Sequence, residues 1–329
     1  MLRCNQMPWP VDWAQLFERE APLHVEVGFG GGQFLLALAR ERPSMNLVGL
    51  EISLPSLRKT AHKLERAQLP NVRLIQGGVE TFLWALCPLG ALAGIYINFP
   101  DPWPKAAHHH RRVINPRFLH LAATRMMPGA VLEIATDHAE YAEVITEVLA
   151  DTPYFVSRQP TPFVTEDHER VRTKYELKAL AEGRTCYYFK WQRNDVPAPD
   201  NFPIPEEVEM PHVVLRSPLT LDEMSARFEP HYLAADEGEI KFIELFQSSH
   251  DGKLLVDVYV HEAALSQRVC LTLRSRRSGD VVIGLHEVGF PRPTVGIHRA
   301  VRALADWIVS LHSEAAIVNS TVHPVIGEQ

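Results

Sequence analysis

Cysteine is scarce in this chain, which has only four among 329 residues: Cys4, Cys87, Cys186 and Cys270. They are widely scattered and include no C-x-x-C pair, which argues against both a disulfide framework and a zinc cluster. Unpaired cysteines are typical of a reducing compartment. We therefore expect free thiols and no metal site.

Long apolar runs are also missing. The longest uncharged stretch ends at Pro100 and is broken by Pro88, Gly90 and Gly94, so it is too interrupted to cross a bilayer. The N-terminal residues show no apolar segment after a basic start, which a secretory signal would require. We expect a cytoplasmic protein without a membrane partner.

Positive charge is in the minority overall, because the net charge is −7. Residues 1–193 nevertheless contain 22 Lys and Arg against 20 Asp and Glu, whereas residues 194–329 contain 11 against 20. No acidic residue lies between Asp101 and Glu133, a stretch with five Lys or Arg and four His. Such a local patch favours phosphate binding, although a solvated basic loop is the alternative.

Residues 1–193 alternate between strand and helix patterns. Apolar β-branched runs predict strands at 24–29, 46–52, 71–77, 92–99 and 130–137. Apolar residues at helical spacing predict helices at 32–43, 53–69, 116–127 and 139–151. Repeated βα units of this length predict a parallel, doubly wound α/β sheet.

A break follows at residues 194–211. Five of the seventeen residues from 195 to 211 are proline and five are acidic, which predicts an extended linker. Beyond it, strand patterns at 240–247, 254–261, 267–274 and 280–288 precede one amphipathic helix at 295–312 and a last strand at 315–322. We expect residues 212–329 to form a smaller α+β domain with an antiparallel sheet.

A glycine-rich loop, "EVGFGGGQF", joins the first predicted strand to the first helix, with Gly28, Gly30 and Gly32 at alternate positions. Such a loop lets a ligand lie against bare backbone at a helix N-terminus. Glu51 follows nineteen residues after Gly32, where a carboxylate can accept both ribose hydroxyls. The pattern suits a dinucleotide or S-adenosylmethionine, and the G-x-G-x-G spacing together with Glu26 favours S-adenosylmethionine.

A second motif, "NFPDPWPK", follows the predicted central strand. Asp101 lies between Pro100 and Pro102, which restrict the backbone around the carboxylate, and Trp103 offers a face for stacking a base. Three cations that can hold phosphates come next: Lys105, Arg111 and Arg112. A carboxylate, an aromatic ring and cations at the end of a strand indicate a site that receives a nucleotide of a larger nucleic acid.

These motifs, with "GLEIS", "TDHAEYAE" and "TKYE", resemble the TrmB family of tRNA (guanine-N7-)-methyltransferases over residues 23–191. The resemblance implies a Rossmann-like class I S-adenosylmethionine-dependent methyltransferase domain with tRNA as its partner. It implies methylation of guanosine N7 in the tRNA variable loop, at nucleotide 46. The residues that it implies for cofactor binding are Glu26, Gly28, Gly30, Glu51 and Asp101.

The same resemblance makes Asp101 the active-site residue. The substrate-binding positions that it implies are Lys105, Asp137, Thr173, Lys174, Tyr175 and Glu176, and we expect Arg111 and Arg112 to contact tRNA.

Two departures from the family pattern stand out. Gly78 occupies the place where the family usually has an aspartate for the adenine amino group, so we expect modest cofactor affinity unless Gln76 or Glu80 substitutes. The basic run after Lys105 is "AAHHH", whose histidines would make tRNA contact sensitive to pH.

Other functions stay open at this point. One is a base methyltransferase directed at an amino group, because "DPW" loosely resembles that class's motif. Another is a tRNA-binding protein of the same family that has lost catalysis. A nicotinamide-dependent dehydrogenase shares the fold but leaves "NFPDPWPK" unexplained. The C-terminal domain lies outside the resemblance, and packing or self-association is its expected role; the hairpin cations Arg274, Arg276 and Arg277 lie in a domain too acidic for an extended nucleic-acid face.

Overall fold

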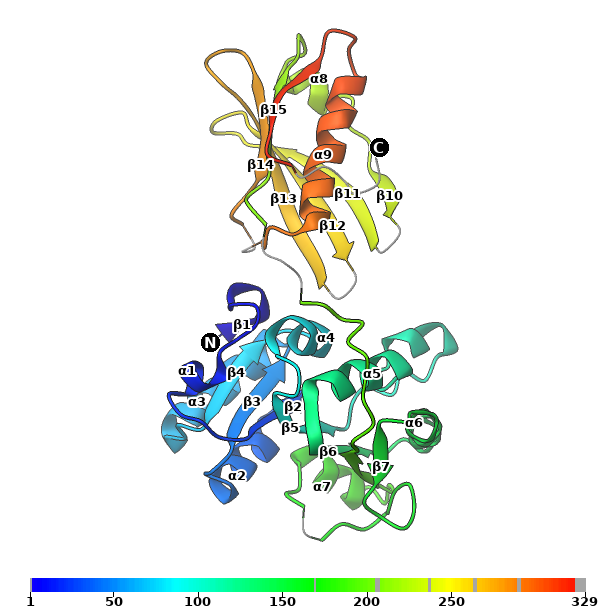
Figure 1. Cartoon of the computed structure of the whole chain (residues 1–329). Helices are drawn as coiled ribbons and strands as arrows, with labels where there is room; N and C mark the ends of the chain where they lie inside the picture. Colours follow the sequence, from blue (N-terminus) through cyan, green and yellow to red (C-terminus); the bar gives the residue numbers. More distant parts are fainter. Residues whose placement is uncertain are drawn as a thin grey trace. The chain divides into compact units, whose positions relative to one another are not determined.

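The computed structural model describes residues 2–168, 170–204, 208–235, 238–262, 265–288 and 291–322. The chain divides into two compact units, Met1–Ile204 and Pro205–Gln329 (Figure 1). Within the described residues, no helix is both long enough and apolar enough to cross a membrane.

The first unit is built on an eight-stranded sheet with helices on both faces. Its strand order is β1-β4-β3-β2-β5-β6-β8-β7. The strands are β1 (Leu2–Arg3), β2 (Leu23–Val27), β3 (Asn46–Glu51), β4 (Val72–Gln76), β5 (Leu92–Asn98), β6 (Met126–Thr136), β7 (Phe155–Ser157) and β8 (Tyr187–Arg193). The strands from β1 to β6 pair in parallel, which confirms the doubly wound α/β fold. The sheet is mixed rather than wholly parallel, because β8 pairs antiparallel with β6 and with β7.

The helices of this unit follow the predicted periodicity where a prediction was made. They are α1 (Trp13–Phe17), α2 (Gln33–Glu41), α3 (Leu54–Ala67), α4 (Val79–Thr81), α5 (Pro116–Arg125), α6 (Ala139–Asp151) and α7 (Lys174–Ala181). Shorter helical turns are η1 (Cys4–Gln6), η2 (Phe82–Leu86) and η3 (Ala106–Arg111). α2 and α3 pack on β3 and β4 through one apolar cluster that contains Leu35, Leu57 and Leu74.

Residues 194–204, which we predicted to belong to the linker, pack on the first unit. Arg125 is completely buried and donates to the carbonyls of Leu83 and Phe202 and to the Asp200 carboxylate. The Trp84 indole donates to the Pro203 carbonyl over 2.6 Å. The division between the units after Ile204 thus lies inside the predicted linker.

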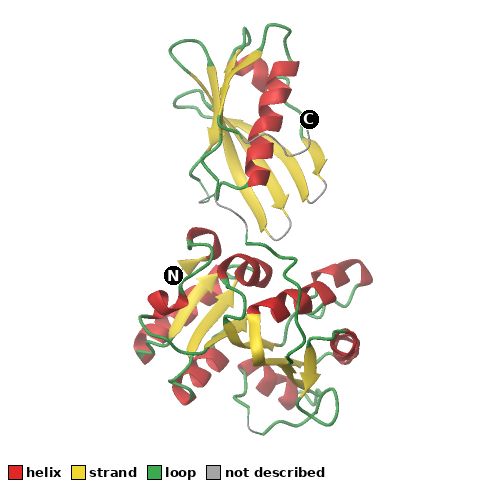
Figure 2. Cartoon of the chain, in the orientation of Figure 1, coloured by secondary structure: helices red, strands yellow, loops and turns green. Residues whose placement is uncertain are grey.

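The second unit is an antiparallel sheet with one long helix against a face (Figure 2). Its strand order is β10-β11-β12-β13-β14-β9-β15. The elements are β9 (His212–Arg216), α8 (Leu221–Ser225), β10 (His231–Ala235), β11 (Gly238–Gln247), β12 (Leu254–Glu262), β13 (Leu265–Ser275), β14 (Val281–Leu285), α9 (Val295–Ser310) and β15 (Ala316–Ser320). Ile297, Val301, Leu304 and Ile308 of α9 are fully buried against the sheet. This arrangement confirms the predicted α+β domain.

Candidate active site

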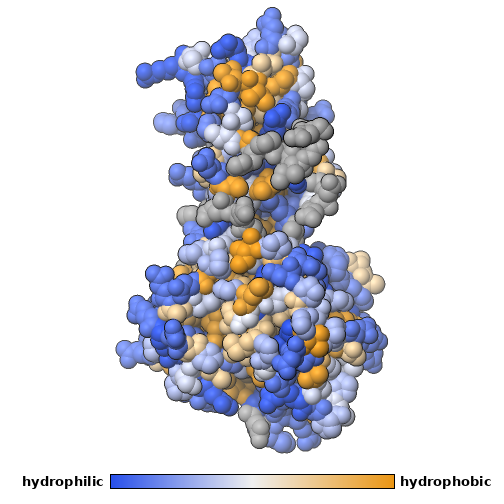
Figure 3. Space-filling view, viewed as in Figure 1, coloured by the Kyte–Doolittle hydropathy of each residue, from blue (hydrophilic) through white to orange (hydrophobic). Residues whose placement is uncertain are grey.

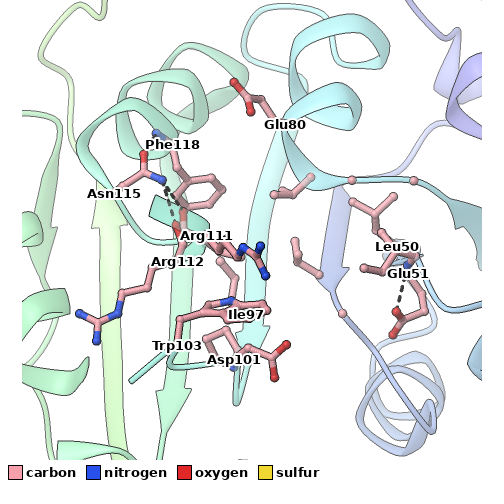
Figure 4. Close-up of a pocket in the computed structure, with 18 of the residues that line it drawn as sticks. Leu50, Glu51, Glu80, Ile97, Asp101, Trp103, Arg111, Arg112, Asn115 and Phe118 are labelled. Carbon is pink, nitrogen blue, oxygen red and sulfur yellow. Dashed lines mark hydrogen bonds between the residues drawn. The ribbon is translucent and has the colours of Figure 1, made fainter. Parts of the chain in front are cut away.

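The candidate site lies where the strand order reverses. β2 neighbours β5, and the chain adds β3 and β4 on one side and β6 on the other. The loops after β2 and β5 therefore meet at one edge of the sheet, the usual ligand position in an open α/β fold. A cavity of about 600 Å³ lies there and includes Gly28, Glu51, Gly78, Asp101 and Arg111 among its lining residues. Figure 4 shows Trp103 and Arg111 on one side of it and Leu50 and Glu51 on the other.

The glycine loop presents bare backbone on the β2 side. Gly28 and Gly30 have φ of +70° and +50°, and a Cβ on either would meet no atom within 4 Å. The space beside the loop can therefore be filled by a ligand. The loop is fixed by Glu51, whose carboxylate accepts from the backbone N–H of Gly30 (2.9 Å), Ile52 (2.9 Å) and Ser53 (3.0 Å). A carboxylate has about four acceptor positions, so Glu51 keeps capacity for a ligand hydroxyl.

Glu26 is a buried carboxyl group beneath this loop, with 2% of its surface exposed. Burial raises its pKa to about 7, although the hydrogen bond from Asn98 and the charge of Arg170 favour the ionised form. Asn98 Nδ2 donates to Oε1 over 3.0 Å, whereas Oε2 has no hydrogen-bond partner among the described residues. A buried oxygen without a donor is costly, and an ammonium group is a suitable donor.

The residues present fit S-adenosylmethionine. Its ammonium matches the Glu26 oxygen that lacks a donor, and one ribose hydroxyl matches the remaining acceptor position of Glu51. The open space beside Gly28 and Gly30 accommodates a ligand against the backbone.

The loop that carries Asp101 has a strained backbone. Phe99 and Trp103, on either side of it, adopt left-handed φ of +52° and +44°, which costs about 1–2 kcal/mol for each non-glycine residue. Asp101 itself is exposed at the cavity. Strain of this kind persists where the surrounding structure enforces it, and it gathers at functional sites.

Arg112 holds this loop in place. It is 5% exposed, and it donates to the Pro102 carbonyl (2.7 Å) and to the Glu140 carboxylate (2.9 Å). Its guanidinium also lies over the Tyr141 ring. Arg112 is thus occupied within the protein, and the tRNA contact that we expected of it stays a prediction.

The remaining basic residues of this loop are exposed or half-buried. Lys105 and Arg111 are exposed, and η3 carries the three histidines between them. The Arg111 guanidinium lies 4.8 Å from the centre of the Trp103 ring, and His108 approaches the same ring edge-on. The ring that we expected to stack on a base therefore already carries a cation on one face.

The "TKYE" segment begins α7 with a capping box. Thr173 Oγ1 accepts from Glu176 N (2.9 Å), and the Glu176 carboxylate accepts from Thr173 N (3.2 Å). Tyr175 is half exposed, and its ring lies 5.3 Å from that of Phe99. This contact brings "TKYE" against "NFPDPWPK" across more than seventy residues of sequence. Lys174 is exposed.

A buried polar chain connects this segment to the cofactor side. Glu176 accepts from Arg170 Nε (3.3 Å) and from the Tyr188 hydroxyl (2.9 Å). Arg170 also donates to Asn98 Oδ1, and Asn98 donates to Glu26. No sequence motif pointed to Arg170. Asn98 begins the "NFPDPWPK" motif, but no role was predicted for it.

Asp137 and Gly78 complete the predicted positions. Asp137 forms an ion pair with Arg184. Gly78 lines the cavity as the N-cap of α4, and a Cβ there would meet nothing within 4 Å. Glu80, a predicted substitute for the missing aspartate, instead pairs with Arg117 at 2.8 Å.

Comparison with known proteins decides the family. The model of a family described as putative methyltransferase matches residues 20–189. A tRNA (guanine-N(7)-)-methyltransferase from Thermus thermophilus is 35% identical over 301 residues, which cover 91% of this chain and 92% of that protein. This chain belongs to the tRNA (guanine-N(7)-)-methyltransferase family. The relative of the same name from Deinococcus radiodurans is 31% identical over 97% of this chain and 98% of its own, so it matches the second unit as well.

Other members of the tRNA (guanine-N(7)-)-methyltransferase family match a shorter part. The one from Mycolicibacterium paratuberculosis is 39% identical over 184 residues, 56% of this chain and 71% of its own. Across the part of the chain that the structure describes, no three His, Cys, Asp or Glu side chains gather as metal ligands would.

Proposed function

We propose that this enzyme transfers a methyl group from S-adenosylmethionine to N7 of the guanosine at nucleotide 46 of tRNA. The observation that carries the proposal is the meeting of three segments at the sheet's switch point. These are the bare glycine loop, the strained Asp101 loop, and "TKYE" packed on the latter through Phe99 and Tyr175.

When bound, S-adenosylmethionine supplies an electrophilic methyl group on its sulfonium. Guanine N7 has an in-plane lone pair, so the reaction needs no strong base. The task of the protein is to align donor and acceptor. Glu26, Gly28, Gly30 and Glu51 are the residues proposed to hold the cofactor. Asp101, which the resemblance also places beside the cofactor, is proposed to act mainly on the guanine.

Asp101 acts on the guanine as charge develops. Methylation at N7 makes the base cationic, and a carboxylate positioned before the reaction stabilises that charge. The left-handed residues on either side of Asp101 limit the directions in which it can point. Lys105 and Arg111, both exposed, are placed to hold phosphates, whereas Arg112 keeps the loop in shape.

The remaining assignments are proposals of the same kind. Thr173, Lys174, Tyr175 and Asp137 are proposed to contact the substrate, with Glu176 orienting that segment from within. The four unpaired cysteines are in keeping with action in a reducing cytoplasm.

Labelled methyl transfer to unmodified tRNA transcripts tests the proposal. Transcripts with guanosine at nucleotide 46 should accept label, and those with adenosine there should not. Asp101→Ala should lower kcat by 10²-fold or more while affinity for S-adenosylhomocysteine stays within about threefold. Tight tRNA binding without transfer by the native enzyme would instead favour a tRNA-binding protein that has lost catalysis, an outcome to which Gly78 gives weight.

A further inference from the structure

A group of cations borders the glycine loop on α2 and α3, and none of them forms an ion pair with another described residue. Lys63 Nζ donates to the Gly31 carbonyl over 2.6 Å, so this ammonium touches the outer side of the loop. Lys59 lies one turn earlier on the same face of α3. Lys63 shares a surface groove with Arg40 of α2 and with Arg66. Figure 3 shows strongly hydrophilic residues at the margin of the first unit where Figure 1 places α2 and α3.

Lys174 of the "TKYE" segment joins this group. Burial, and after it repulsion from Lys59 and Lys174, lowers the pKa of Lys63. Lys59 and Lys174 each repel Lys63. Val171, three residues before Lys174, packs on the same apolar cluster as Leu57 of α3, which places the start of α7 beside α3. The cations of "TKYE" and α3 thus form one surface, although about 110 residues of sequence separate them.

These cations differ from several others in the same unit. Arg112, Arg117, Arg170, Arg184 and Lys190 each pair with a carboxylate. In the described part of the chain, no ion pair joins an acidic group to any of the five cations of this group, which are Arg40, Lys59, Lys63, Arg66 and Lys174. Like charges brought together without counterions oppose folding, and a polyanion relieves that repulsion while releasing its own counterions.

We propose that these five residues, the α3 cation surface, bind the tRNA phosphate backbone outside the methylated nucleotide. The inference rests on the proposed function, because it takes tRNA to be the polyanion. The resemblance to the family pointed only to Lys174; the other four sit in segments that sequence reasoning interpreted simply as helices. Their placement beside the glycine loop makes the surface continuous with the cofactor site, so a bound tRNA would extend across α3 as its guanine enters the cavity.

The test measures tRNA affinity of the full-length enzyme across about 50–200 mM salt by fluorescence anisotropy. Lys59→Ala should weaken binding by about threefold to tenfold and reduce the slope of log K against log salt by about 0.7–0.9. The double variant, Lys59→Ala with Arg66→Ala, should reduce this slope by about twice that amount. In methyl transfer, KM for tRNA should rise while kcat at saturating tRNA stays unchanged.

Lys59→Arg is the matched control, because it keeps the charge and should keep the native slope. Affinity for S-adenosylhomocysteine should be native in every variant, which reports an intact cofactor site. An unchanged slope in the double variant, with tRNA bound normally, would overturn this surface and leave the proposed function standing. A loss of tRNA affinity in Lys59→Arg equal to that in Lys59→Ala would also overturn this surface. Failure of the native enzyme to bind tRNA would overturn both.

Discussion

Arg170 and Glu176 form an ion pair in which both side chains are almost fully buried, with 5% and 0% of their surfaces exposed. The pair fixes the start of α7, and Arg170 extends the contact to Asn98 and thus to Glu26. Two parts of the proposed site, one for tRNA and one for the cofactor, therefore depend on the same guanidinium.

Replacing Arg170 by Met should destabilise the protein. The change leaves the Glu176 carboxylate buried without its cation, which costs about 3–5 kcal/mol in comparable cases. Urea unfolding measures this free energy. Lys178→Ala is the control, because its pair with Glu182 is largely exposed and should contribute no more than about 1 kcal/mol. Equal effects from the two variants would contradict the importance of the buried pair.

The pKa of Glu26 predicts a pH dependence of cofactor affinity. Since burial raises it to about 7, the free enzyme holds this group mostly protonated below that pH. An ammonium ligand favours the carboxylate, so affinity for S-adenosylhomocysteine should rise on the order of tenfold between about pH 5.5 and 7. Calorimetry should also show proton release on binding. Glu26→Gln should bind weakly with a flat profile; a parallel profile in both proteins would argue against the assignment.

The raised pKa of Glu26 also makes the stability of the fold depend on pH. The folded state binds this proton more tightly than the unfolded chain does, so the contribution of Glu26 to stability falls as pH rises from about 4.5 to 7. Glu26→Gln should therefore melt at a higher temperature than the native protein at pH 8 when no ligand is present. A lower melting temperature there would show that the carboxylate stabilises the fold.

Gly78→Asp should tighten cofactor binding. The site has room for a side chain, and the glycine has an ordinary backbone conformation with φ of −84°. An added carboxylate that accepts from the adenine amino group is worth about 1.5–3 kcal/mol, or at least tenfold in Kd. Gly78→Ala adds only the Cβ and should leave Kd unchanged. Equal affinity in the Asp and Ala variants, measured by calorimetry, would show that residue 78 does not face the adenine.

Local patterns predicted most of the fold. The switch-point position of Asp101 followed from one apolar strand and the motif after it, and the helix at 295–312 buries the face expected from its spacing. The antiparallel strand β8 was not predicted, because "YYFKWQR" does not continue the alternation of strands and helices along the sequence. Its pairing with β6 identifies it as a strand. The partners of Arg125, Arg112 and Arg170 could not be predicted either, because ion pairs between distant segments leave no periodic signal in the sequence.

The packing of residues 194–204 predicts where the chain can be shortened. A truncation after Ile204 keeps the Asp200 and Phe202 partners of the buried Arg125, whereas one after Arg193 removes them. Losing them should cost about 3 kcal/mol, which corresponds to roughly 6–12 °C in melting temperature for a unit of this size. Calorimetric scans of both fragments measure the difference. Identical melting temperatures would mean that residues 194–204 belong to a free linker.

The most direct test of the account is methyl transfer to a tRNA that carries 7-deazaguanosine only at nucleotide 46. This substitution replaces N7 by C–H and leaves the Watson–Crick edge of the base unchanged. We predict that such a tRNA binds as well as the unmodified transcript and accepts no methyl group. Incorporation equal to that of the unmodified transcript would contradict N7 of this guanosine as the acceptor.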